Sequence, residues 1–315
     1  MPIILQESLR GLLYAPYYAA LTLGAYRQEG IEVSFVSAPT PAQAPAGLFA
    51  GAVDVAWGGP MRVMQMYETR PDCDLVCFGE VVTRDPFLLV GREPRPDFAL
   101  ADLYGKRVAI VSEVPTPWLC LQEDIRRVGL DPDALPRIAN RTMSENAASL
   151  RRGEVDVIQV FEPFAEELIA AGAGHIWYAA AKRGPTAYTS FYARRSTLTA
   201  RRRELKGMVR GLYRTQKWLF SQPPEALADA VQSFFPDVAA ALLRGAVARY
   251  QSLGIWGRNP ILPRTGYERL KAGLVSGSFV KQGAQFEQAV DNSLAEEVVR
   301  EDPPPLASSR GHWRC

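Results

Sequence analysis

The chain has 315 residues, of which 47% are hydrophobic and 22% are charged, so it has the balance of a globular protein with length for about two domains. A formal net charge of +2 is too small an excess to indicate binding to nucleic acid or to a membrane surface. No stretch approaches the ~20 consecutive apolar residues of a transmembrane helix, so we expect no direct membrane insertion.

Histidine and cysteine are too scarce and too scattered to form a metal site. The chain has two histidines and four cysteines, the latter at positions 73, 77, 120 and 315. A structural metal site needs about four well-spaced ligands. We therefore expect no metal, no cofactor and no disulfide framework.

The first part of the chain alternates short apolar strands with helices, as an α/β domain does. Strands are predicted at 3–5, 31–37, 53–57 and 75–82. Helices are predicted at 17–28 and 61–68, and a further one ends at Gly51. Gly30 ends the first of these helices, and Gly58-Gly59-Pro60 forms a turn at the carboxyl end of the third strand.

A second α/β lobe follows. Its predicted strands lie at 107–111, 155–161 and 175–179. One predicted helix ends at Gly129, and another runs from an N-cap at Ser144 to Gly153. The strand-like segments 85–92 and 188–194 are predicted at an edge of this lobe, where the chain crosses out and returns. The lobes would then comprise residues 1–86 with 193–300, and residues 87–192.

Beyond residue 194 the pattern is helical. Helices are predicted at 200–221, 223–234, 236–252 and 264–274, with prolines between them. Because no strands separate these helices, we expect them to pack on the first lobe. Residues 301–315 include three consecutive prolines and are predicted to be disordered.

One line of sequence occurs twice. Residues 46–60 read AGLFAGAVDVAWGGP and residues 148–163 read ASLRRGEVDVIQVFEP, with Asp54 aligned to Asp156. Each copy reads as a helix end, an acidic turn, an apolar strand and a loop closing on proline. Solenoid repeats recur every 20–50 residues. The much longer offset here indicates two similar lobes instead.

Two lobes joined by two crossings leave a cleft, and ligands of open parallel sheets bind at the carboxyl ends of the strands. Thr116, before Pro117, is predicted to cap a helix whose free N–H groups bind an anion, although a well-capped helix needs no ligand. Arg84 suits a carboxylate or sulfonate, or equally a salt bridge to Asp85. Glu162 is predicted either to hold an amino group or to neutralise Arg84.

The remaining candidates are neutral. Asn140 and Ser190 are hydrogen-bonding candidates, and Gly58, Gly59 and Ser112 lie in loops that follow strands. The aromatic candidates for packing on a ring are Tyr14, Tyr17, Trp57, Trp118 and Tyr188. Most buried aromatic side chains belong to a core, so we expect only part of this set to face a ligand.

Taken together, residues 14–20, 24–33 and 51–60 of the first lobe, and 103–110 and 153–163 of the second, resemble the type II periplasmic binding proteins. Within that class the chain is similar to the branch (NMT1/THI5-like) of sulfonate, taurine and thiamine-pyrimidine binding proteins. The resemblance implies a two-lobed α/β fold, with two parallel-rich sheets, a double-strand hinge and extra C-terminal helices. It also implies a small-molecule ligand, anionic or zwitterionic, and an ABC transporter permease as partner.

The alternatives come from the same branch. The pyrimidine synthases carry an active-site histidine in the first lobe and a cysteine-dense motif, whereas the first histidine here is His175. No nucleotide-binding, hydrolase or metalloprotease motif is found either. We therefore expect a monomeric, non-catalytic binding protein without catalytic residues. The resemblance implies a periplasmic location if a leader has been removed, and a cytoplasmic ligand sensor if the chain is complete.

Overall fold

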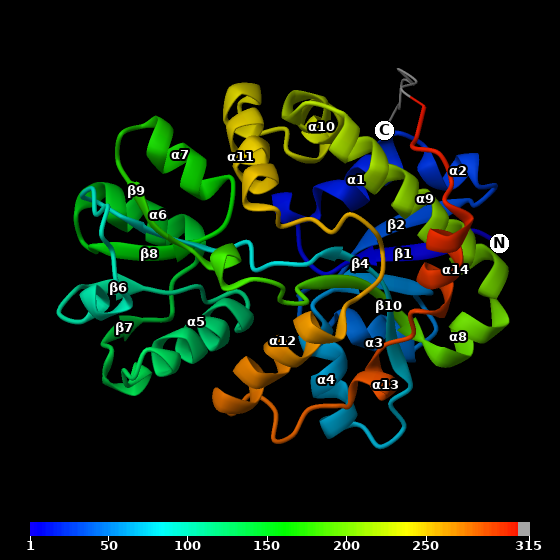
Figure 1. Ribbon diagram of the computed structural model, residues 1–315, viewed down its shortest axis with the longest axis horizontal. Helices are drawn as coiled ribbons and strands as arrows, with labels where there is room; N and C mark the ends of the chain where they lie inside the picture. Colours follow the sequence, from blue (N-terminus) through cyan, green and yellow to red (C-terminus); the bar gives the residue numbers. More distant parts are fainter. Residues whose placement is uncertain (308–315) are drawn as a thin grey trace.

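The computed structural model describes residues 1–307 and shows two five-stranded sheets, each surrounded by helices (Figure 1). The first sheet has the order β2 (Val33–Ser37), β1 (Ile3–Glu7), β3 (Val55–Gly58), β10 (Thr189–Arg194) and β4 (Leu75–Val82). The second has the order β7 (Arg137–Ile138), β6 (Val108–Ala109), β8 (Val157–Val160), β5 (Leu88–Gly91) and β9 (His175–Ala179). The predicted two-lobed α/β fold is confirmed.

Each sheet contains one strand that runs antiparallel to both of its neighbours. In the first sheet β1 pairs in parallel with β2 and β3, whereas β10 runs antiparallel to β3 and β4. In the second sheet β6 pairs in parallel with β7 and β8, whereas β5 runs antiparallel to β8 and β9. The two antiparallel strands, β10 and β5, are those that the chain enters directly from the other lobe. Parallel neighbours need a crossover connection, usually a helix, whereas these two strands are reached without one.

The positions of β5 and β10 correct the prediction for the crossings. Both were expected at an edge of the second lobe, but β5 lies between β8 and β9, and β10 lies between β3 and β4 of the first sheet. All six residues of β10 pair with β4, so the predicted boundary between 192 and 193 falls inside a strand. The connecting segments are 83–87 and 180–188, and the other lobe limits stay predictions.

The sequence repeat has a structural reason. Asp54 precedes β3, and its carboxylate accepts the N–H of Ile4 at 2.8 Å. Asp156 precedes β8 and accepts the N–H of Arg107 at 2.9 Å in the same way. In each lobe the repeated acidic turn therefore fastens a central strand to the start of its parallel neighbour.

Helices cover both faces of the first sheet. They are α1 (Ala15–Thr22), α2 (Ala25–Gln28), α3 (Ala44–Phe49), α4 (Pro60–Thr69), α8 (Arg195–Ala200), α9 (Arg202–Ser221), α10 (Pro224–Val231), α13 (Phe286–Ala289) and α14 (Ser293–Glu301). Side chains alternate along the strands, so Leu5 and Trp57 pack toward α1 and α9, whereas Ile4 and Ala56 pack toward α4. Gly24, with a φ of +67°, separates α1 from α2 where one helix was predicted.

The second lobe has its own helices, and two of the C-terminal helices reach it. Its helices are α5 (Thr116–Arg127), α6 (Met143–Arg152) and α7 (Phe164–Ala170). Thr142, not the predicted Ser144, caps α6, through a reciprocal pair of hydrogen bonds with Glu145. As predicted, the C-terminal helices α11 (Ala240–Leu253) and α12 (Arg264–Ser276) contact the first lobe, through α10 and α4 respectively. They also contact the second lobe, α11 through α7 and α12 through α5, which the prediction did not include (Figure 1).

Residues 301–307, at the end of the described part of the chain, pack against α9. Glu301 ends α14, and Leu306 is 4% exposed and donates its N–H to the carbonyl of Arg214 on α9. Arg214 also donates to the carbonyl of Pro304 at 3.1 Å. The predicted disorder is therefore wrong for 301–307, because α9 offers apolar surface and hydrogen bonds to this segment. The rest of that prediction, 308–315, lies outside the described residues.

Candidate functional site

A cavity lies between the two sheets, at the carboxyl ends of their parallel strands. It encloses about 530 Å³ of empty space, part of which is open to solvent. Its lining residues are Ser8, Leu9, Leu13, Tyr14, Pro41, Gly58, Gly59, Met61, Arg62, Phe87, Val114, Thr116, Phe161, Tyr188 and Tyr192. Both lobes and both connecting segments contribute, so the cavity depends on how the lobes are placed against each other.

Five of the predicted site residues line this cavity: Tyr14, Gly58, Gly59, Thr116 and Tyr188. Each ends or follows a strand or lies on a connecting segment, which is why strand polarity could indicate them. The capping role predicted for Thr116 is wrong in detail. Thr116 is the first residue of α5 and Pro117 the second, and no side chain caps this helix.

Three predicted residues belong to the core of the first lobe. Trp57 is 0% exposed and lies between the ring of Tyr17, at 4.7 Å, and that of Phe35, at 5.2 Å. Tyr17 donates its hydroxyl to the carbonyl of Gly79. The Ser190 hydroxyl is buried and donates to the carbonyl of Phe191. Trp57 and Tyr17 belong to the core cluster that also contains residues of α1 and α9, and none of the three residues lines the cavity.

The other predicted residues also lie outside the cavity lining. Ser112 and Asn140 are exposed, and Trp118 packs in the second lobe with the guanidinium of Arg137 4.4 Å from its ring. Glu162 is fully buried but pairs with Arg249 of α11 at 2.7 Å. It therefore does not neutralise Arg84, which lies at a different cleft.

Arg62 is a charged residue of the cavity lining that the sequence did not predict. It lies in the first turn of α4, one residue beyond the loop that was considered, and its Nη1 donates to Gln65 at 2.8 Å. Burial lowers the pKa of Arg62, although a guanidinium stays charged throughout the physiological range. Among the described residues no carboxylate lies within 4.0 Å of it, so its charge faces the cavity uncompensated.

Helix ends add to this positive potential. Tyr14 occupies the N-cap of α1, Gly59 the N-cap of α4, and Thr116 the first position of α5, and all three line the cavity. No side chain hydrogen bond caps any of these ends, and the helix dipole favours an anion there. The nearest strand-end carboxylate, Glu7, is already paired with Arg10 at 2.6 Å.

Two hydroxyl groups at the cavity lack partners. The Oη atoms of Tyr188 and Tyr192 are buried and make no hydrogen bond within the described part of the chain, although both residues line the cavity. A buried hydroxyl without a partner costs about 1 to 3 kcal/mol. A ligand that offers acceptors would satisfy both groups.

The remaining wall is apolar. Leu9, Leu13, Met61, Phe87 and Phe161 line the cavity, and no cysteine, histidine, aspartate or glutamate occurs among its described lining residues. The site thus offers one cation, several hydrogen-bond donors and flat apolar surface. This combination suits the binding of an organic anion.

Two five-stranded sheets, joined twice and facing one cavity, define the two-lobed periplasmic binding protein fold. The periplasmic sulphonate binding protein SsuA of Escherichia coli has this fold, with a TM-score of 0.73 and 15% identity over 100% of this chain and 96% of SsuA. The desulfurization enzyme DSZB, solved as a mutant in complex with biphenyl-2-sulfinic acid, has a TM-score of 0.68 and 15% identity over 96% of this chain and all of DSZB.

The sequence itself places the chain in a family. A model described as NMT1/THI5 like matches residues 13–226, more than half of the chain, so the protein belongs to the NMT1/THI5-like family. The Bacillus subtilis protein YtlA, named as a binding protein, is 22% identical over 297 residues, which is 94% of this chain and 89% of YtlA. The predicted family is thereby confirmed. None of the helices within residues 1–307 has the length and apolar character to span a membrane.

Proposed function

We propose that this protein is a solute-binding protein that closes around a small organic anion and presents it to an ABC transporter. The observation that carries the proposal is the uncompensated Arg62 guanidinium in a cavity that three helix N-termini also face. The fold shared with E. coli SsuA, a periplasmic sulphonate binding protein, supports the same class of solute.

The cavity chemistry narrows the ligand. A sulfonate or carboxylate would pair with Arg62 and accept hydrogen bonds from Tyr188 and Tyr192. Its other end would lie on apolar surface formed by Phe87 and Phe161, whose ring centroids are 5.3 Å apart. Alkyl or aryl sulfonates and aromatic acids meet both requirements, whereas a cationic solute would be repelled by the charge of Arg62.

Closure would act through the two connecting segments. On one side of them, α11 holds the second lobe through Arg249, which pairs with Glu162 and with Glu166 of α7, each at 2.7 Å. On the other side, α12 packs on α5. We propose that these contacts form as the lobes close and that 83–87 and 180–188 bend, because only these segments join the sheets directly.

A catalytic role has less support. DSZB shows that the fold can serve an enzyme. However, the described lining offers no thiol, imidazole or carboxylate as nucleophile or base. A role in pyrimidine-precursor synthesis or as a cytoplasmic sensor therefore remains the weaker alternative.

Calorimetric titration with a panel of sulfonates, aromatic acids and thiamine pyrimidines tests the proposal. We expect Arg62→Ala to lower the affinity for the tightest-binding ligand by more than tenfold. Arg62→Lys should lower it less, since Lys keeps the charge but loses the planar guanidinium. Arg84→Ala is the matched control and should leave affinity unchanged, because Arg84 lies outside the cavity lining. Equal affinity in Arg62→Ala and the parent protein would contradict the proposal.

We further propose a periplasmic location, as for SsuA, and a monomeric state. Fractionation of cells that express the full native gene checks the location. Recovery of the protein with the cytoplasmic fraction alone would favour the sensor alternative. Sedimentation velocity checks the oligomeric state.

A further inference from the structure

A second cleft lies beside the first connecting segment and shares no lining residue with the ligand cavity. It forms where residues 254–263 run along the end of β4. Glu80 donates its N–H to the carbonyl of Pro260, and Gly257 donates to that of Val81, each at 2.8 Å. The cleft encloses about 970 Å³ of empty space, which includes open solvent.

Two arginines line this cleft without a counter-ion. Within the described part of the chain, neither Arg84 nor Arg258 has a carboxylate within 4.0 Å. The Arg258 guanidinium lies 4.4 Å from the ring centre of Phe220, which also lines the cleft, so stacking holds its planar fork in place. Arg84 has a single long hydrogen bond, 3.5 Å to the carbonyl of Ala181.

Within the described part of the chain, the acidic residue of the cleft forms no ion pair with either arginine. Glu80 is 1% exposed, and one of its carboxyl oxygens has no hydrogen-bond partner. Burial raises the pKa of Glu80 well above its ordinary value, because removal from solvent disfavours the charged carboxylate. No other acidic residue occurs in the described lining of the cleft.

We propose that this cleft is a second binding site, for a small oxyanion, with Arg84 and Arg258 as its cationic contacts and Glu80 at its inner wall. Arg84 belongs to the connecting segment between the lobes, whereas Arg258 belongs to the segment that follows α11. A bound oxyanion would therefore join the connecting segment to the C-terminal helices. The organic ligand of the first cavity would not be displaced by it.

Phosphate binding to the full-length protein tests this inference, by calorimetry and by ³¹P line broadening at constant ionic strength and pH 7. We expect one saturable phosphate per chain, weakened at least tenfold by Arg84→Met and by Arg258→Met. Arg258 is exposed, so its variant should fold normally. Arg62→Ala, in the first cavity, and Arg244→Met, at an exposed pair with Asp229, should leave phosphate binding unchanged.

Two results would overturn the inference. One is the absence of saturable binding of phosphate or sulfate at concentrations up to about 10 mM. Another is loss of phosphate binding in Arg62→Ala while Arg258→Met binds normally, since the ion would then occupy the ligand cavity. Circular dichroism and melting temperature verify that each variant is folded, independently of binding.

Discussion

The fully buried Glu162 makes a pH-dependent contribution to stability that can be measured. Its Oε1 lies 2.7 Å from Arg249 on α11, and its Oε2 accepts the N–H of Glu166 at 2.9 Å. Burial raises the pKa of Glu162 to about 7, although the Arg249 charge opposes that rise. In the unfolded chain a glutamate has a pKa of about 4.3.

The sign of the effect follows from these two values. The native protein holds the proton of Glu162 more tightly than the unfolded chain, so stability falls as pH rises through the interval from about 4.3 to about 7. At about 1.4 kcal/mol per pKa unit, the full loss is at most about 4 kcal/mol. Roughly 2 to 3 kcal/mol of it should fall between pH 5 and pH 8.

Glu162→Gln removes the titrating group and keeps its size. Between pH 5 and pH 8, the unfolding free energy of the parent protein should fall by about 2 to 3 kcal/mol relative to that of the variant. Urea denaturation at pH 5, 6, 7 and 8, with equal m-values, measures it. The effects of all other groups cancel in the difference.

A difference that stays constant across this range would refute the reasoning, because Glu162 would then titrate at an ordinary pKa. Arg249→Met is the informative second variant. It removes the charge that lowers the pKa of Glu162, so the pH at which stability falls should move upward. A downward movement would contradict the ion pair seen here.

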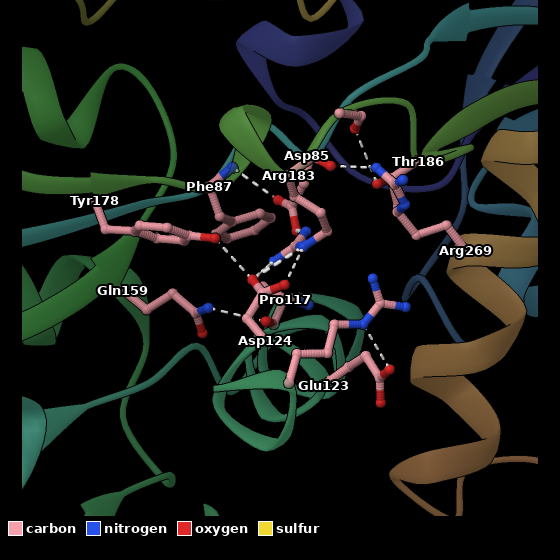
Figure 2. A network of polar contacts seen from close by, with 12 residues as sticks. Asp85, Phe87, Pro117, Glu123, Asp124, Gln159, Tyr178, Arg183, Thr186 and Arg269 are labelled. Atoms are coloured by element: carbon pink, nitrogen blue, oxygen red, sulfur yellow. Dashed lines mark hydrogen bonds and ion pairs between the residues drawn. The ribbon is translucent and has the colours of Figure 1, made fainter. Parts of the chain in front are cut away.

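Three further substitutions test the roles assigned to buried residues. Arg183 pairs with the buried Asp85 and Asp124 (Figure 2), so Arg183→Met leaves both carboxylates without a counter-ion and should lower stability by about 3 to 5 kcal/mol in thermal and urea unfolding. Trp57→Phe should cost about 1 to 3 kcal/mol yet change ligand affinity less than twofold by calorimetry, and a tenfold loss would return Trp57 to the site. Gly91→Ala makes the new Cβ overlap the Trp177 ring and should cost about 1 to 3 kcal/mol by overpacking, whereas an unchanged melting temperature would show that the ring moves freely.

The polar network around Arg183 shows a limit of reasoning from sequence. Arg183 comes from the second connecting segment, Asp85 from the first and Asp124 from α5 (Figure 2). Asp85 was considered only as a partner of its neighbour Arg84. The actual pair spans 98 positions, and no local pattern indicates such a distant partner.

Local patterns along the chain were enough to predict the two lobes, their repeated acidic turns and the loops where a ligand could bind. Those features follow from strand period, glycine and proline positions and strand polarity, which act over a few residues. The set of side chains that face the cavity, in contrast, became visible only in the folded protein. Arg62 faces it, whereas Trp57 is enclosed between aromatic rings and Glu162 meets Arg249, because these orientations depend on segments that are brought together only when the chain folds.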